Sequence, residues 1–335
     1  MKILIDSYST IYQRGGGGIP MRVSTIVDGL AKKGINVKCF DKWNDKITDY
    51  DILHIFKANI DSYSEIVYAK NSGVKVVLSS VVAQEGILKI ILGRLLNKLF
   101  RINNTYSYLK LMLEMSDRIL AQTEKEARFI TMFYGIQNKK INIIPNGINQ
   151  AIVESYSPYI DKDIVLCVGR FDKNKNQISL IRAMKGQNIP VHFVGGIVPE
   201  DKDYYEQCLD EAQSDTNFVF HGWLKQGSPE LLSLFSRAKV CVLISYKEIF
   251  GNAIIEGAAC GSNLVVTSSL PTSEYGFQSN YFIVNPHSLK EIREAVKCAF
   301  SMPVSHSLRD TAISRFSWDS VVEQHINVYE NLIKD

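Results

Sequence analysis

The sequence has 335 residues, 46% of them hydrophobic, and a formal net charge of +3. A chain of this length exceeds what one ordinary hydrophobic core holds, so we expect two domains of roughly 150 residues each. The charge is modest, and Lys and Arg concentrate in one short segment only, which argues against a nucleic-acid partner.

Six cysteines are scattered singly, mostly within apolar runs and without any Cys-x-x-Cys spacing: Cys39, Cys167, Cys208, Cys241, Cys260 and Cys298. We expect reduced core residues of a cytosolic protein. No His and carboxylate residues cluster at metal-ligand spacing, so no metal site is expected. The opening MKILIDSYS lacks the apolar segment of a signal peptide, and no apolar run is long enough to span a bilayer. The sequence therefore predicts a cytoplasmic protein.

The first half of the chain alternates strands with helices. Residues 1–7 predict a strand, the glycines at 15–18 a loop, and the helical spacing of Val23, Ile26, Val27 and Leu30 a helix. Further strands are expected within 34–41, 51–56 and 73–80, as in a doubly wound parallel sheet. The glycines allow a ligand to approach the backbone closely, although a flexible surface loop is the alternative. They do not fit a dinucleotide-binding fingerprint, because Pro20 or Met21 stands where a glycine is needed, and this disfavours an NAD-dependent oxidoreductase.

Residues 86–102 (GILKIILGRLLNKLFRI) differ from the rest of the chain. Lys89, Arg94, Lys98 and Arg101 are set among Ile, Leu and Phe, with no acidic residue between them. Such a basic amphipathic helix can lie in the headgroup region of an anionic membrane. A core helix with solvated basic residues is the alternative, and the uniform sign of the charge favours the membrane.

A domain boundary is expected near the middle of the chain. Thr123 begins a predicted helix whose Glu124 and Glu126 suit the positive end of the helix dipole. A strand then ends in the turn Pro145, Asn146 and Gly147, with a hinge within 146–162. The second half repeats the alternation, with a helix over 176–184 and strands within 163–170, 191–196, 218–223, 239–245, 263–268 and 282–284.

Charged residues follow two strands of the second half. Arg170 and Lys175 lie just beyond the first of these strands, at the carboxyl edge of a parallel sheet, where such folds bind ligands. Glu248 ends the strand KVCVLIS, and Glu256 lies in the helix that follows Gly251. The cations and the helix N-terminus together suit a pyrophosphate, whereas each feature alone is usually a solvated surface.

Several motifs together resemble glycosyltransferase family 4, also described as glycosyl transferases group 1, which are retaining nucleotide-sugar-dependent enzymes of GT-B fold. The motifs are IPNGIN, VGRFDKNKNQ, FHGW, EIFGNAIIE with its E-x(7)-E spacing, EGAACG and FSWDSVVEQHINVYENL. The resemblance covers nearly the whole chain and is strongest from Ile144 to Pro286. It implies an α/β architecture of two doubly wound, Rossmann-like domains that face each other across a cleft. The acceptor-side domain would be 1–148 and the nucleotide-sugar domain 149–315, with a terminal helix, 316–335, crossing back to the first domain.

The resemblance also implies roles for individual residues. Arg170 and Lys175 would hold the donor diphosphate, Glu256 the ribose hydroxyls and Glu248 the donor sugar, so the implied catalytic residues are Glu248, Arg170 and Lys175. The implied donor-binding residues are Gly16, Gly17, Arg170, Lys175, Glu248, Phe250, Gly251, Asn252, Ala253 and Glu256. Glu274 matches another acidic position of the family with a less certain role. Members of the family need no metal or other cofactor.

The chain departs from the family at one position. Many members carry a His directly after the fourth strand, where this chain has Ser79 and Ser80; His54, after the third strand, is a different family position. Either a serine or backbone group takes the role of that His, or the sugar specificity differs.

The resulting hypothesis is a retaining transferase that moves a sugar from a UDP- or GDP-linked donor to a lipid-linked bacterial surface glycan at the inner face of the plasma membrane, which it meets through 86–102. A catalytically silent GT-B scaffold or partner subunit is the alternative, and a GT-B nucleotide-sugar 2-epimerase fits less well.

Overall fold

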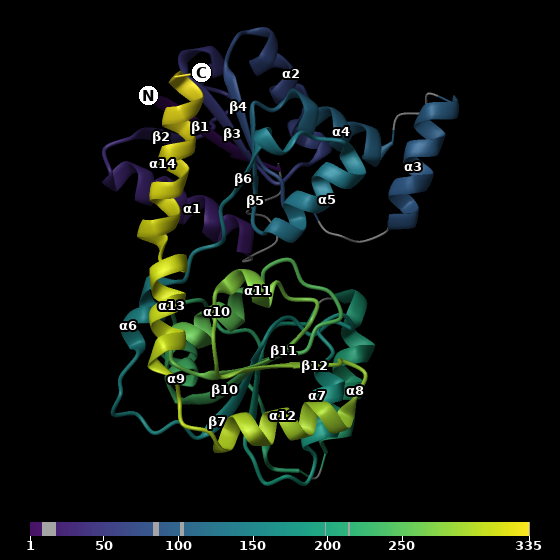
Figure 1. Cartoon of the computed structure of the whole chain (residues 1–335), viewed down its shortest axis with the longest axis vertical. Coiled ribbons are helices and arrows are strands. Elements are labelled where there is room, and N and C mark those ends of the chain that lie inside the picture. Colours follow the sequence, from purple (N-terminus) through teal and green to yellow (C-terminus); the bar gives the residue numbers. More distant parts are fainter. Residues whose placement is uncertain (9–17, 83–86, 101–103, 198, 214, 335) are drawn as a thin grey trace. The chain divides into compact units, whose positions relative to one another are not determined.

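The structure is a computed structural model that describes residues 1–8, 18–82, 87–100, 104–197, 199–213 and 215–334. The chain divides into two compact units, Met1–Gly147 with Trp318–Asp335, and Ile148–Ser317. Each unit contains a six-stranded parallel sheet with helices around it (Figure 1). The expected α/β class with two doubly wound sheets is therefore confirmed.

The strands of the first unit have the order β2-β1-β3-β4-β5-β6. Their bounds are β1 Lys2–Ser7, β2 Asn36–Cys39, β3 Ile52–Phe56, β4 Lys75–Ser79, β5 Arg118–Ala121 and β6 Ile141–Ile143. The helices are α1 Gly18–Lys32, α2 Tyr63–Asn71, α3 Ile87–Phe100, α4 Thr105–Met115, α5 Glu124–Tyr134 and α14 Trp318–Lys334, with short 3-10 helices at Ile47–Asp49, Ile60–Ser62 and Asn138–Lys140. Thr123 caps α5 as expected, because its side chain accepts the Glu126 N–H.

The strands of the second unit have the order β12-β11-β10-β7-β8-β9. Their bounds are β7 Ile164–Val168, β8 Val191–Val194, β9 Phe218–Phe220, β10 Ala238–Leu243, β11 Asn263–Thr267 and β12 Tyr281–Val284. The helices are α6 Gln150–Ser155, α7 Gln177–Met184, α8 Lys202–Ala212, α9 Pro229–Arg237, α10 Asn252–Ala259, α11 Thr272–Tyr275, α12 Leu289–Ser301 and α13 His306–Phe316, with a 3-10 helix at Pro199–Asp201. The order is that of a Rossmann sheet, in which the strand order reverses between β7 and β10.

Helix α14 packs on the first unit although it follows the second along the chain. Val321, Val322 and Tyr329 share a hydrophobic core with α1 and with strands β1 and β3, and α14 lies against α1 (Figure 1). The Tyr329 hydroxyl lies 2.7 Å from Nδ1 of His54 on β3, and both groups are buried. These contacts attach α14 to the middle of the first sheet.

The cysteines only partly match the expectation that they are reduced residues of the hydrophobic core. All six are free, and Cys167, Cys208, Cys241 and Cys260 are buried. Cys39 and Cys298 are exposed. Cys39 ends β2, an edge strand paired only with β1. Cys298 lies off the buried face of α12, which is formed by Ile292, Val296 and Ala299.

No helix among the described residues is both long and apolar enough to cross a membrane.

Candidate functional site

The candidate site of the second unit lies at the carboxyl ends of β7 and β10, where the strand order reverses. A crevice at such a switch point is where doubly wound sheets bind ligands. The loop after β7 carries Arg170 and Lys175, and the loop after β10 carries Glu248. The topology therefore brings together charged residues that are more than seventy positions apart in the sequence.

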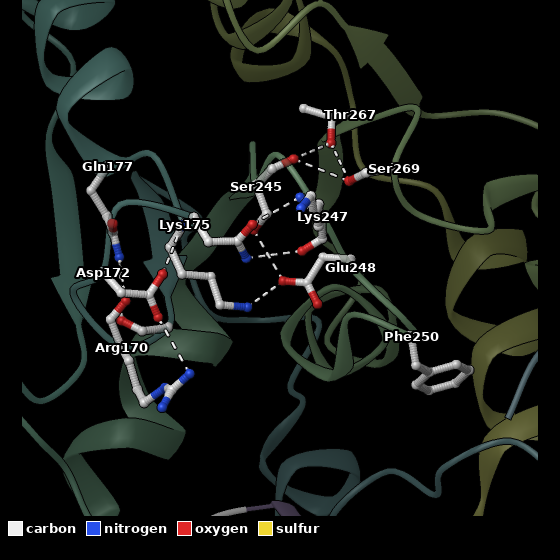
Figure 2. Close-up of polar contacts among 12 residues, drawn as sticks. Arg170, Asp172, Lys175, Gln177, Ser245, Lys247, Glu248, Phe250, Thr267 and Ser269 are labelled. Atoms are coloured by element: carbon white, nitrogen blue, oxygen red, sulfur yellow. Dashed lines mark hydrogen bonds and ion pairs between the residues drawn. The ribbon is translucent and has the colours of Figure 1, made fainter. Parts of the chain in front are cut away.

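Hydrogen bonds tie the two loops to each other (Figure 2). The Asn174 side chain donates to the carbonyl oxygen of Lys247 at 2.9 Å and accepts from its N–H at 3.0 Å. The Asn174 carbonyl oxygen also accepts the Tyr246 N–H at 2.8 Å. Three bonds to one residue hold the loops in a fixed relation, which pre-organises the charged groups that they carry.

Lys175 and Glu248 form an ion pair between the loops (Figure 2). Their side chains are only 19% and 12% exposed, respectively. The bonded oxygen, Oε1 of Glu248, also accepts a hydrogen bond from the Ser245 hydroxyl at 3.0 Å. Since both side chains are mostly buried, the pair is screened less by solvent than a surface salt bridge.

Arg170 lies on the same loop but remains accessible. Its guanidinium is 3.4 Å from Oδ2 of Asp172, and its side chain is 69% exposed. Asp172 also accepts the Lys175 N–H at 3.0 Å, which shapes the turn between the two cations. The Gln177 side chain donates to the Arg170 carbonyl oxygen at 2.8 Å. Arg170 thus presents a guanidinium fork to solvent from a well-braced backbone.

Helix α10 begins directly after the Glu248 loop. Gly251 precedes its first residue with a φ of 74°, a left-handed conformation that favours glycine. Phe250 is buried, and its carbonyl oxygen accepts the hydroxyl of Tyr275. Gly257 lets the helix pack closely on the sheet, because a Cβ there would overlap the Cys241 side chain of β10. The N-terminus of α10 is therefore held at the ligand edge of the sheet, where the positive end of the helix dipole suits an anion.

Glu256 is the buried carboxylate of this helix. It is 9% exposed, and burial raises its pKa from 4.5 to about 8. The Gln226 amide, 3.4 Å from Oε1, partly offsets this effect. A buried carboxylate with one long hydrogen bond retains capacity to accept donors, such as the hydroxyls of a ligand.

Three of the other predicted residues lie in helices of the second unit. Asn252 and Ala253 are partly buried in the first turn of α10. Glu274 lies in the short helix α11. Gly16 and Gly17 lie outside the described residues, so their donor role stays a prediction.

Other residues of the site were not found from the sequence. Asp172, Asn174 and Ser245 all bond the charged residues or their loops. The Asp-x-x-Lys order of Asp172 and Lys175 is a local turn signal that could have indicated the first of these bonds. Asn174 and Ser245 act between loops that are far apart in sequence, so no local pattern reveals them.

Ser79 and Ser80 are committed to buried bonds in the first unit. The Ser79 hydroxyl lies 2.9 Å from Nε2 of His54. The Ser80 hydroxyl donates to Oε1 of Glu126 at 2.8 Å. Glu126 is fully buried and also accepts the N–H groups of Val82 and Gln122, at 2.7 and 2.8 Å. It therefore braces the turn after β4, besides lying in the first turn of α5.

No group of three or more His, Cys, Asp or Glu residues within the described ranges could hold a metal ion.

Comparisons with known proteins agree with this architecture. Residues 149–314 match the family described as Glycosyl transferases group 1. The solved structure of sucrose-phosphate synthase from Thermosynechococcus elongatus covers 100% of both chains, with a TM-score of 0.78 and 17% identity. The structure of HepE from Anabaena in complex with UDP covers 99% of this chain and 100% of its own, with a TM-score of 0.72 and 15% identity. The fold is thus GT-B, and residues 149–314 belong to the glycosyl transferases group 1 family.

Curated relatives are longer than this chain. A D-inositol 3-phosphate glycosyltransferase from Nocardiopsis dassonvillei is 28% identical over 173 residues, which are 45% of this chain and 40% of the relative. The chain spans about half the length of the curated relatives it matches.

Proposed function

We propose that this protein is a retaining glycosyltransferase that moves a sugar from a nucleoside diphosphate sugar to a lipid-linked acceptor of a bacterial surface glycan. The observation that carries the proposal is the meeting of Lys175, Glu248 and the α10 N-terminus at the ligand edge of the second sheet. Family membership supports the same reaction class. A UDP complex of HepE makes UDP the first nucleotide to test, with GDP as the other candidate.

The charges of the site suit a departing diphosphate. Arg170 offers an exposed guanidinium fork, and Lys175 offers an ammonium whose present partner is Glu248. A bound diphosphate would compete with Glu248 for Lys175, which would leave the Glu248 carboxylate available to the hydroxyls of the donor sugar. Donors aimed at the developing charge stabilise the transition state without covalent chemistry.

Retention of configuration follows, in this proposal, from attack on the face that the diphosphate leaves. The leaving phosphate would help to deprotonate the acceptor hydroxyl, so no protein nucleophile is required. Glu256 would hold the ribose, and the backbone of residues 250–253 would support the sugar and the β-phosphate. The chemistry proceeds by alignment and charge stabilisation, without a metal or other cofactor.

The acceptor would be met at an anionic membrane surface. Helix α3 carries the apolar residues Ile91, Leu92 and Leu95, which are 45%, 56% and 48% exposed. Arg94 is exposed among them. Lys89, Lys98 and Arg101 add charge of the same sign, although their side chains lie outside the described residues. This composition supports a peripheral location on the inner face of the plasma membrane.

Ligand-induced stabilisation tests the nucleotide site. We expect one of UDP, GDP, ADP and CMP, or its sugar conjugate, to raise the melting temperature with or without a metal chelator. At 100 times its Kd a ligand adds about 2.7 kcal/mol, which for a unit of this size is about 5 to 11 °C. Arg170→Ala should reduce the shift, whereas Arg182→Ala, which removes an exposed guanidinium paired with Glu211 on α8, should preserve it. Folded protein that responds to none of these nucleotides would instead favour a catalytically silent partner subunit.

A further inference from the structure

A cavity of about 480 Å³ lies in the first unit, beside the carboxyl ends of β3 and β4. Its wall is mostly apolar and includes Val82, Ile90, Leu96, Tyr106, Leu109 and Tyr134. Ala58 and Ser80 extend the lining to the residues that follow β3 and β4. The cavity therefore reaches from α3 and α4 to the edge of the sheet where parallel folds bind ligands.

Helix α3 and the start of α4 approach each other closely at Gly93, beside this space. The Gly93 carbonyl oxygen accepts the Asn104 side chain at 3.0 Å, and a Cβ on Gly93 would lie 3.0 Å from Cβ of Tyr106. The helices meet at that glycine. In Figure 1, α3 stands at the periphery of the unit. Leu92 and Leu96, on either side of Gly93, line the cavity.

The inner wall contains a strained residue held by a buried carboxylate. Val81 has a φ of 43°, which is unfavourable for a β-branched side chain. Its neighbours Ser80 and Val82 both donate to Oε1 of Glu126, at 2.8 and 2.7 Å. Strain of this kind costs roughly 1–3 kcal/mol and persists where the surroundings impose it, often at ligand sites. The hydrogen bonds to Glu126 therefore fix this turn as part of the cavity wall.

Helix α3, which borders the cavity, carries charge of one sign. Its sequence contains Lys89, Arg94 and Lys98 and no acidic residue. Arg94 is exposed. Such a segment suits the phosphate of a lipid whose hydrocarbon chain enters the apolar space.

We propose that this cavity binds one hydrocarbon chain of an anionic lipid, which is the lipid-linked acceptor if the proposed function holds. The hydrocarbon chain would lie between α3 and α4, the phosphate near Arg94 of α3, and the sugar near Ser80 at the sheet edge. The cavity is distinct from the outer face of α3, because Ile91 and Leu95 do not line it.

The test measures the binding of hexyl, octyl and decyl phosphate by calorimetry, without detergent and below micelle-forming concentrations. Each buried methylene contributes about 0.8 kcal/mol, so we expect affinity to rise about fourfold per methylene until the cavity is filled. Leu109→Trp should fill the cavity and abolish binding. The matched control Leu111→Trp, on the same helix at a residue that is 38% exposed, should bind as the unmodified protein does.

A second pair of variants keeps the test valid if Leu109→Trp fails to fold. Leu96→Trp, inside the cavity, should also abolish binding, whereas Leu95→Trp, on the outer face of α3, should not. Binding without chain-length dependence, or equal binding by all four variants, would overturn the proposal. Nucleotide-induced stabilisation, measured on the same samples, reports the second unit separately. If no nucleotide stabilises the unmodified protein, the proposed function is refuted. If nucleotides stabilise it but the alkyl phosphates do not bind, only the cavity site is refuted.

Discussion

Glu248 and Lys175 neutralise each other across two loops of the second unit. The same pair fixes both side chains near the α10 N-terminus before any ligand arrives. In the proposed function, a diphosphate would compete with the Glu248 carboxylate for the Lys175 ammonium. The ion pair would thus oppose diphosphate binding while it positions Glu248 for the sugar.

Replacing Glu248 by Gln should separate these two effects. We expect hydrolysis of the donor to fall by about 100-fold or more, a size typical of a lost transition-state contact. The Kd for the nucleoside diphosphate alone should fall by up to about tenfold, because Lys175 loses its anionic competitor. Donor hydrolysis and calorimetry check the two results. Full activity in both Glu248→Gln and Arg170→Ala would refute the assigned site.

The buried carboxyl of Glu256 makes a pH dependence testable. Its pKa in the folded protein is about 8, against an ordinary value of 4.5. Between these values the folded state keeps a proton that the unfolded state has lost. The contribution of Glu256 to the free energy of unfolding is therefore largest below pH 4.5. It declines by about 1 kcal/mol per pH unit until about pH 8.

Glu256→Gln removes this titration. The free energy of unfolding of the variant, minus that of the unmodified protein, should rise by about 1 kcal/mol per pH unit from pH 5 to 8. Urea denaturation at several pH values measures the difference. Nucleotide binding should release protons from the unmodified protein only, because ribose hydroxyls favour the ionised carboxylate. Parallel stability curves for the two proteins would contradict the assignment.

At the scale of elements, α3 carries two sets of apolar residues. Leu92 and Leu96 line the cavity, whereas Ile91 and Leu95 do not. A helix that packed only as part of the core would not leave Ile91 and Leu95 close to half exposed. This exposure favours the membrane interpretation of residues 86–102 over the core-helix alternative.

Neutralising this helix should detach the protein from membranes. Changing Lys89, Arg94, Lys98 and Arg101 to Gln removes about 1 kcal/mol of attraction per residue, which predicts roughly 1,000-fold weaker binding to anionic vesicles. Vesicle flotation measures the loss, and high salt should reproduce it. A control that changes Arg182, Lys185, Lys202 and Lys290, all exposed cations of the second unit, should bind normally. Unchanged flotation of the α3 variant would refute the membrane claim.

At the scale of the whole molecule, periodicity accounts for most of what the sequence could predict. Apolar runs such as 239–245 correspond to buried parallel strands, and their alternation with helices gave the fold class correctly. Exposure was harder to predict. Cys39 and Cys298 are exposed because edge-strand position and helix rotation depend on the assembled sheet.

The site was predictable only where its residues lie in local motifs. Arg170, Lys175 and Glu248 follow strands, so their edge of the sheet could be inferred from the sequence. The bonds made by Asn174 and the buried role of Glu126 depend on segments that meet only in the folded chain. The pattern of the first helical turn indicated only that Glu126 suits the helix dipole, and its burial depends on tertiary packing.

Helix α14 gives the chain an unusual order of assembly during synthesis. The second unit is one continuous segment, Ile148–Ser317, whereas the first unit needs Trp318–Asp335 as well. As the ribosome moves along the message, the second unit is complete before the last helix exists. Until Val321, Val322 and Tyr329 emerge, the face of the first sheet around Ile3, Ile5 and Phe56 lacks part of its cover. The unit that is synthesised first therefore finishes folding last, and chaperones have their longest opportunity to bind that uncovered face.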